Sequence, residues 1–123
     1  MARVLVIGLD KAARLLIKNS LECVGHTVNM AASFAEGSEN LSQSGSEVVV
    51  TNLHIPESEF LKSLAHLRAE FPRVRILAIA SEYETMDFLA VRMMGADDVL
   101  RQPLASKTLL DAVDQALREN ENS

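Results

Sequence analysis

The sequence predicts an α/β fold in which five strands alternate with helices, and the pattern of apolar residues carries that prediction. Apolar runs of strand length occur five times along the 123 residues, at 3–7, 27–31, 48–51, 75–79 and 98–100. Three of them contain continuously apolar stretches, as expected of strands buried on both faces of a parallel sheet. Segments of helical period lie between the runs. Strands that alternate with helices imply a parallel sheet with right-handed crossovers and helices on both faces.

The segments between the strands repeat apolar residues at helical spacing, and we expect these stripes to face the core. The stripes of the first, third and last helix are Leu15, Leu16, Ile17, Leu21 and Val24; Phe60, Leu64, Leu67 and Phe71; and Leu109, Leu110, Val113 and Leu117. Helix starts are indicated by the N-cap residues Asp10, Ser33 and Ser106, and helix ends by Gly25, Gly45 and Gly95. The polar stretch 36–46 is the weakest element and predicts a short frayed helix.

Composition narrows the classes of function. The net charge of −5, with 12 basic against 17 acidic residues, argues against direct nucleic-acid binding, which needs clustered positive charge. The apolar runs fall far short of the roughly 20 residues that cross a bilayer, and the N-terminus lacks the layout of a signal peptide. We therefore expect a cytoplasmic protein without membrane contact, with one domain at 1–119 and a polar tail at 120–123. The single Cys23 fits a reducing compartment, and we expect it to be packed.

Ligands of open parallel sheets bind beyond the carboxyl ends of the strands, so functional residues are sought there. The residues at four strand ends are Gly8, Leu9 and Asp10; Asn52 to Pro56; Ala80, Ser81 and Glu82; and Arg101, Gln102, Pro103 and Leu104. Set beside the run Gly95-Ala96-Asp97-Asp98, this arrangement resembles the receiver domain of two-component response regulators. The similarity covers nearly the whole chain and includes Pro56, four residues after Asn52, and Pro103 after the last strand.

The resemblance implies a flavodoxin-like (βα)5 three-layer sandwich with strand order 2-1-3-4-5 and a signalling function without enzymatic activity. It also implies the family's site: an acidic pair after the first strand and an aspartate after the third hold Mg²⁺, and that aspartate accepts phosphate. A hydroxyl after the fourth strand and a lysine before the late proline hold the phosphoryl oxygens. Carboxylates are the hard oxygen ligands that Mg²⁺ prefers.

This sequence departs from the family at each of these positions. The acidic pair maps onto Gly8 and Leu9, the phosphate acceptor onto Asn52, the hydroxyl onto Ala80 with Ser81 one place later, and the lysine onto Gln102. An aromatic residue of the last strand maps onto Val99. An amide is a poor nucleophile and a weak metal ligand. We expect no phosphorylation by the family's mechanism, no cofactor, and Mg²⁺ binding that is absent or weak.

The leading hypothesis is a degenerate receiver that binds a protein partner or a second copy through the fourth helix, last strand and fifth helix. Candidate interface residues are Met86, Phe88, Arg92, Val99, Arg101 and Lys107. Methionine adapts to varied partners, which favours Met86; Leu89 and Met93, at i, i+4 spacing, are expected in the core. Arg118 belongs to the same charged rim. His54 and His66 are interpreted as solvated.

Three alternatives stay open from the sequence. A phosphorylatable regulator could use Ser81 or Asp10 as acceptor. Asp10 could instead join the backbone carbonyl after Asn52 in a weak divalent-ion site, although its N-cap role explains it without a metal. The neutral pocket at Gly8, Asn52 and Ser81 could bind a small uncharged or anionic ligand.

Overall fold

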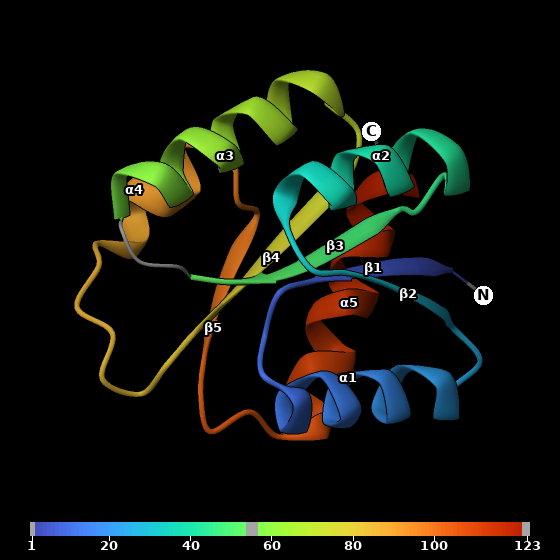
Figure 1. The fold of residues 1–123 in the computed structure, drawn as a ribbon. Coiled ribbons are helices and arrows are strands. Elements are labelled where there is room, and N and C mark those ends of the chain that lie inside the picture. Colours follow the sequence, from blue (N-terminus) through green and yellow to red (C-terminus); the bar gives the residue numbers. More distant parts are fainter. Residues whose placement is uncertain (1, 54–56, 122–123) are drawn as a thin grey trace.

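The computed structural model describes residues 2–53 and 57–121, which form a three-layer α/β sandwich (Figure 1). The elements are β1 (Arg3–Ile7), α1 (Lys11–Cys23), β2 (Thr27–Ala31), α2 (Phe34–Ser44), β3 (Val48–Asn52), α3 (Glu57–Glu70), β4 (Arg75–Ala80), α4 (Phe88–Met93), β5 (Asp98–Arg101) and α5 (Ser106–Glu121). All strand pairs are parallel, in the order β2-β1-β3-β4-β5. The predicted fold class and strand order are confirmed.

The sheet divides the core into two clusters, because neighbouring residues of a strand face opposite sides. On one face, Val4, Val50 and Leu77 pack against Ile17 and Leu21 of α1 and against α5. The other cluster joins alternate strand residues to α2, α3 and α4; among its buried members are Leu5, Ile7, Val49, Ile76, Ala78, Leu41, Phe60, Leu64 and Val91. The three strands predicted to be buried on both faces, β1, β3 and β4, therefore lie at the centre of the sheet.

Helix α2 is a complete helix with a cap at each end, whereas the polar stretch 36–46 predicted a short frayed one. It spans 11 residues, begins at the N-cap Ser33, whose hydroxyl accepts a hydrogen bond from the Glu36 amide, and ends at Gly45 in the left-handed conformation. It lies close to β1 at Gly37, where a Cβ would stand 2.6 Å from the Ile7 Cδ1 atom. Close packing on the sheet, which composition does not show, stabilises this helix.

Helix α1 buries a narrower stripe than predicted. Ile17 and Leu21 are buried, whereas Leu15, Leu16 and Val24 are 47%, 43% and 47% exposed. Cys23, expected to be packed, is exposed at the last turn of the same helix. Its position, two residues after Leu21, lies about 200° around the helix from that core residue.

The two ends of α5 also differ from expectation. Ser106 is the first helical residue, and its hydroxyl lies 2.8 Å from the hydroxyl of Ser20 in α1, so it links two helices instead of capping one. The helix continues to Glu121, two residues into the segment predicted to be a polar tail. No helix among the described residues is long and apolar enough to cross a membrane.

Helix α4 has only six residues, and its core-facing side differs from the prediction. Asp87 caps it, and Val91 is its buried residue. Leu89 and Met93, two positions to either side of Val91, lie about 200° away from it and are 65% and 78% exposed. The prediction that they fill the core is wrong. Met86, predicted to lie in this helix, precedes it and is buried at 8% exposure.

A polar network at the amino ends of the strands joins α3 to β4 and β5. The Arg68 guanidinium donates to the Gly95, Pro72 and Val74 carbonyl oxygens and, at 2.7 Å, to the Asp97 carboxylate. Asp97 also accepts from the Ile76 amide at 2.7 Å and from Arg75 at 3.2 Å. The side chains of Arg68 and Asp97 are 25% and 21% exposed, so this ion pair is largely withdrawn from water.

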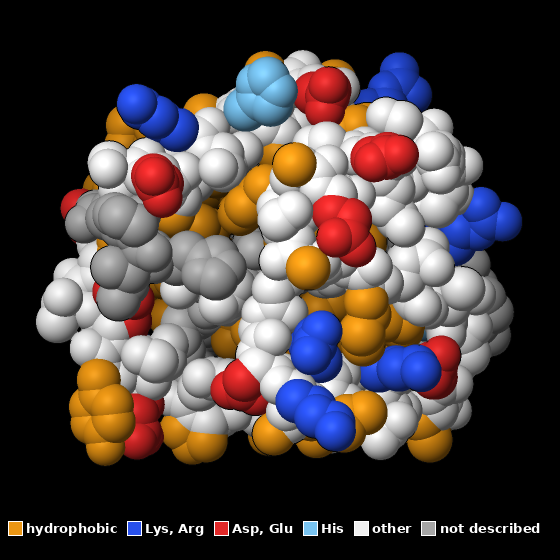
Figure 2. All heavy atoms as spheres, in the orientation of Figure 1, with side chains coloured by type: hydrophobic (Ala, Val, Ile, Leu, Met, Phe, Trp, Pro, Cys, Tyr) orange, Lys and Arg blue, Asp and Glu red, His pale blue; other side chains and the backbone are white. Residues whose placement is uncertain are grey.

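A groove lies between α2 and α3, on the face of the sheet that these two helices cover. It encloses about 490 Å³, and the space-filling view looks onto this side of the molecule (Figure 2). Its walls are formed by Phe34, Ala35, Ser38, Lys62, Ser63, His66 and Glu70. His66 is exposed on its rim, as predicted, whereas His54 and Pro56 lie outside the described residues.

We expect the substitution Arg68→Met to lower the free energy of unfolding by about 3 kcal/mol, because it leaves the Asp97 carboxylate and three backbone carbonyls with fewer donors. Urea denaturation followed by circular dichroism measures the loss. Arg92→Met is the matched control: its ion pair with Asp98, at 2.8 Å, is 53% and 44% exposed, and its loss should change stability by less than about 1 kcal/mol. Equal losses of unfolding free energy in both variants would contradict the conclusion that the Arg68 network stabilises the fold.

Candidate functional site

The strand ends predicted to carry the site meet at one edge of the sheet. Ile7 of β1 pairs with Thr51, Asn52 of β3 pairs with Ile79, and Ala80 of β4 pairs with Arg101 of β5. The residues that follow these strands therefore lie side by side. The sequence located this edge correctly.

The chain turns sharply after β1, through two residues in the left-handed region. Gly8 has φ 72° and donates its amide to the Ala31 carbonyl at 3.0 Å, and Leu9 has φ 71°. Gly8 adopts this conformation freely, whereas a side chain there costs about 1–2 kcal/mol. Leu9 is half-buried against the core cluster shared by α1 and α5, and this contact offsets part of the cost.

Asp10 is held by the start of α1. Its Oδ1 atom accepts a hydrogen bond from the Ala13 amide at 2.8 Å, and its carbonyl accepts from the Arg14 amide at 2.9 Å. These bonds satisfy backbone donors that a helix start leaves free. The predicted N-cap role of Asp10 is confirmed.

Asn52 and Ala80 end neighbouring strands of the edge. Asn52 is half-buried, and its Oδ1 atom is buried without a hydrogen-bond partner among the described residues. Ala80 is fully buried, whereas Ser81 is exposed one residue later. The hydroxyl nearest this edge on β4 therefore belongs to the loop that follows the strand.

The residues of this edge do not fit a Mg²⁺ ion, which takes hard, preferably anionic, oxygen ligands in octahedral geometry. Gly8 and Leu9 have no side-chain oxygen, and Asn52 offers a neutral amide. The Oδ1 atom of Asp10 already accepts a hydrogen bond at the N-terminus of α1. Within the described residues, no group of three or more His, Cys, Asp and Glu side chains could hold a metal ion.

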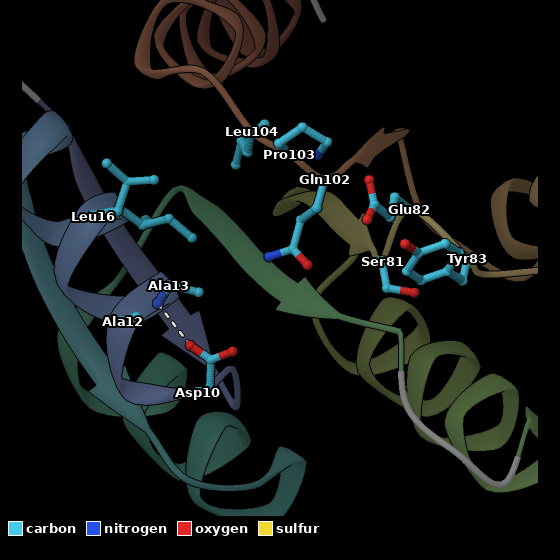
Figure 3. A pocket seen from close by; sticks show the side chains of 11 residues that line it. Asp10, Ala12, Ala13, Leu16, Ser81, Glu82, Tyr83, Gln102, Pro103 and Leu104 are labelled. Atoms are coloured by element: carbon cyan, nitrogen blue, oxygen red, sulfur yellow. Dashed lines mark hydrogen bonds between the residues drawn. The ribbon is translucent and has the colours of Figure 1, made fainter.

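A groove of about 500 Å³ opens at this edge between α1 and the loops after β4 and β5, and we call it the edge groove. Its lining residues are Asp10, Ala12, Ala13, Leu16, Ile17, Ser81, Glu82, Tyr83, Gln102, Pro103 and Leu104. Figure 3 shows the Gln102 amide extending into the space between α1 and the β4–α4 loop. Gly8, Asn52 and Ala80 do not line it, so the neutral pocket predicted at Gly8, Asn52 and Ser81 contributes only Ser81 to this groove.

Arg101 fixes the loop that forms one wall of the edge groove. Its guanidinium Nη1 donates to the carbonyl oxygens of Ser81, Glu82 and Glu84 at 3.0, 3.2 and 3.2 Å. The guanidinium also lies over the Phe88 ring, 4.7 Å from its centroid, in a cation–π contact. One side chain of β5 thus holds both the β4–α4 loop and the first residue of α4.

The expected interface residues have different surroundings. Met86 and Val99 are buried, at 8% and 9% exposure, because both pack into the cluster beneath α3 and α4; the prediction that they are accessible is wrong. Phe88 is half-buried beneath Arg101. Arg92 and Lys107 are exposed and pair with Asp98 and Asp111 of their own chain.

Sequence reasoning missed the roles of Arg68 and Arg101. Arg68 bonds to residues 27 and 29 positions away, and Arg101 to a residue 20 positions away, which no local period reveals. Tyr83 and Leu104 of the edge groove were also missed. Their signal was present, since both lie in the segments that follow strand ends.

We expect Arg101→Leu to make the amides of residues 81–88 exchange hydrogen about tenfold faster, because the loop loses its bonds to the guanidinium. Hydrogen exchange followed by mass spectrometry measures this change. Arg92→Leu, which removes an exposed arginine of α4 engaged with Asp98, is the control and should leave these amides unchanged. Unaltered exchange in Arg101→Leu would show that the loop is held by other contacts.

Comparison with known proteins identifies related sequences. Residues 4–114 match the family model described as the response regulator receiver domain. Curated relatives include the response regulator MprA of Mycobacterium ulcerans, 28% identical over 116 residues, and that of Mycobacterium leprae, 27% identical over 116 residues. Each alignment covers 94% of this chain and 50% or 51% of the relative, so the chain spans about half the length of these relatives.

Solved structures share the fold. A response regulator from Thermotoga maritima superposes with a TM-score of 0.85 at 23% identity, covering 96% of this chain and 98% of its own. A CheY-like receiver domain protein from Methanospirillum hungatei superposes with a TM-score of 0.87 at 22% identity, covering 99% of this chain and 98% of its own. The match of the family model over most of the sequence shows that the chain belongs to the response regulator receiver domain family of two-component signalling.

Proposed function

We propose that this receiver domain acts without accepting phosphate, as a module that binds proteins. One observation carries the proposal: the positions where the family resemblance implies charged side chains hold Gly8, Leu9, Asn52 and Gln102 in this chain. All four lie at the carboxyl edge of the sheet, where the fold brings them together. The scaffold is retained while its charges are absent.

Phosphate transfer to this edge would require a nucleophile and a way to offset the charge of the phosphoryl group. An amide such as Asn52 is a poor nucleophile because its nitrogen lone pair is delocalised into the carbonyl. Gln102 is neutral, and Ala80 presents only a methyl group at a fully buried position. The positions that the family uses therefore supply neither the nucleophile nor the compensating charge in this chain.

The remaining structure supports a binding role. The two core clusters and the Arg68–Asp97 pair keep the sandwich together without a ligand. Arg101 holds the β4–α4 loop through backbone carbonyls and the Phe88 ring. The surface presented by α4 is thus fixed by contacts within the chain.

The surface that we propose for partner binding is formed by α4, β5 and α5, and we call it the α4–α5 face. Its apolar part is Leu89 and Met93, one helical turn apart and 65% and 78% exposed, with Met94 37% exposed beside them. Its charged part is the Arg92–Asp98 pair at 2.8 Å and the Lys107–Asp111 pair at 2.9 Å. Since these charges are already paired within the chain, apolar contact should supply most of the affinity. The proposed partner is a second copy of the chain.

Incubation with acetyl phosphate and Mg²⁺ should leave the protein without a phosphate adduct in intact-mass spectrometry. Asn52→Asp alone should also stay unmodified, because the other charged groups of the site are still missing. The positive control combines Gly8→Asp, Leu9→Asp, Asn52→Asp, Ala80→Thr and Gln102→Lys, which together restore the implied set, and this variant should gain an adduct.

An adduct on the unmodified sequence would contradict the proposal. Its loss in Ser81→Ala or in Asp10→Asn would then identify a phosphorylatable regulator with an unusual acceptor. Asp10→Asn keeps the N-cap of α1, since asparagine caps helices as well as aspartate does. A lost adduct in that variant therefore reports the carboxylate and not a disrupted helix.

Sedimentation velocity should show a dimer at micromolar concentration that the double substitution Leu89→Glu and Met93→Glu converts to a monomer, because the added charges would be buried in the interface. Leu15→Glu on α1, at a residue 47% exposed, is the matched control and should keep the dimer. A monomer in the unsubstituted protein, or a dimer that resists the double substitution, would exclude self-association through this face.

A further inference from the structure

The edge groove combines an apolar floor with acidic walls. Ala12, Ala13, Leu16 and Ile17 of α1 and Leu104 after β5 supply most of its hydrocarbon surface. Asp10 and Glu82 contribute carboxylates from different elements, and Figure 3 shows them on opposite sides of the space. No lysine, arginine or histidine is among its described lining residues. The groove therefore favours a positive charge carried on an apolar body.

The two carboxylates are not engaged by cations of the chain. Neither Asp10 nor Glu82 forms an ion pair with a described residue, whereas Asp97, Asp98 and Asp111 all have Arg or Lys partners. Asp10 uses its Oδ1 atom to cap α1, which leaves the capacity of its second oxygen for another donor. An ionised acceptor forms a stronger hydrogen bond with a charged donor than with a neutral one.

Hydrogen bonds within the chain fix the position of both walls of the edge groove. Arg101 fixes the carbonyls of Ser81 and Glu82 on one side. On the other side, the hydroxyls of Ser20 and Ser106 join α1 to α5 at 2.8 Å. A site formed in advance loses less conformational freedom on binding. The volume of about 500 Å³ also falls within the usual range of small-molecule sites, about 300–1,000 Å³.

We propose that the edge groove binds a small organic cation, an ammonium group on an aromatic or aliphatic body. The body lies on Ala13, Leu16 and Leu104, and the ammonium group is attracted by the carboxylates of Asp10 and Glu82, which are exposed on opposite sides of the groove. Tyr83, 83% exposed at the rim, offers a ring face to the same charge. This ligand differs from the uncharged or anionic one considered for Gly8, Asn52 and Ser81, and the proposal holds whether or not the domain accepts phosphate.

A small cation fits better than a basic segment of a partner protein. Lys11 and Arg14 lie on α1 beside the groove but outside its lining, and neither has an ion-pair partner among the described residues. A polybasic segment that followed α1 would meet their charge, whereas a compact ligand within the groove meets Asp10 and Glu82 first. Charges in direct contact with the ligand dominate such a balance, because Coulomb attraction falls with distance.

Three probes of similar shape test the proposal on the full chain labelled with ¹⁵N: phenethylamine, phenethyl alcohol and 3-phenylpropionate. Amide shifts should saturate with phenethylamine and should map to residues 12–17, 81–83 and 102–104. The alcohol should bind about fivefold more weakly, and the anion should not bind, because the charge-assisted bonds are lost or reversed. Equal affinity for amine and alcohol, or no saturable shift with the amine, would overturn the proposal.

Variants of the two carboxylates test whether Asp10 and Glu82 attract the ammonium group. Asp10→Asn and Glu82→Gln should each weaken phenethylamine binding about fivefold and leave the alcohol unaffected, while Asn keeps the cap of α1. Asp87→Asn is the matched control, since Asp87 caps α4 through the Leu89 amide at 2.9 Å and lies outside the groove. An equal loss in Asp87→Asn would show only a response to net charge and would also overturn the proposal.

Discussion

The contact between Arg68 and Asp97 is the constraint on which the rest of the structure depends. It joins the end of α3, the turn before β4 and the start of β5 at the amino edge of the sheet. Asp97 accepts from the Ile76 amide and its own amide donates to the Ile76 carbonyl at 2.7 Å, so this residue sets the register between β4 and β5. That register determines where Arg101 and Gln102 emerge at the opposite edge.

The two edges of the sheet have opposite electrostatic characters. At the amino edge, charged side chains are partly buried and paired, with Asp97 bonded to both Arg68 and Arg75. At the carboxyl edge, β1, β3 and β4 end in the neutral side chains of Ile7, Asn52 and Ala80, and the buried Asn52 Oδ1 atom has no hydrogen-bond partner among the described residues. A cluster of paired charges fixes the elements that it joins in one arrangement. A buried polar atom without a partner lowers the free energy of unfolding. The paired charges therefore lie at the amino edge, and the edge groove lies at the carboxyl edge.

The sequence predicted the elements that local patterns control. Continuous apolar runs predicted β1, β3 and β4, and the spacing of Asp10 before an apolar stripe predicted the start of α1, because both depend on residues near in the chain. The orientation of α4 was predicted wrongly because the i, i+4 spacing of Leu89 and Met93 shows that they share a side of the helix but not which side faces the core, and Val91 is the residue that is buried.

Other features had no local signal at all. Helix α2 packs on the sheet through the close approach of Gly37 to Ile7, a contact across 30 positions. The edge of the candidate site was predicted from strand ends, yet its groove is walled by α1 and by a loop that Arg101 holds from β5. Long-range polar contacts of this kind depend on the fold, and the fold has to be known before they can be placed.

The left-handed turn at Leu9 has a consequence for how this domain changes over time. Aspartate and asparagine tolerate such a backbone better than leucine does, so the frame at φ 71° suits a short polar side chain better than the one it carries. An acidic residue at this position would fit the existing main chain, at the expense of an apolar contact with the α1–α5 cluster. The backbone at this position therefore accepts an acidic side chain as well as the leucine that it carries, and exchanging the two requires no new main-chain conformation.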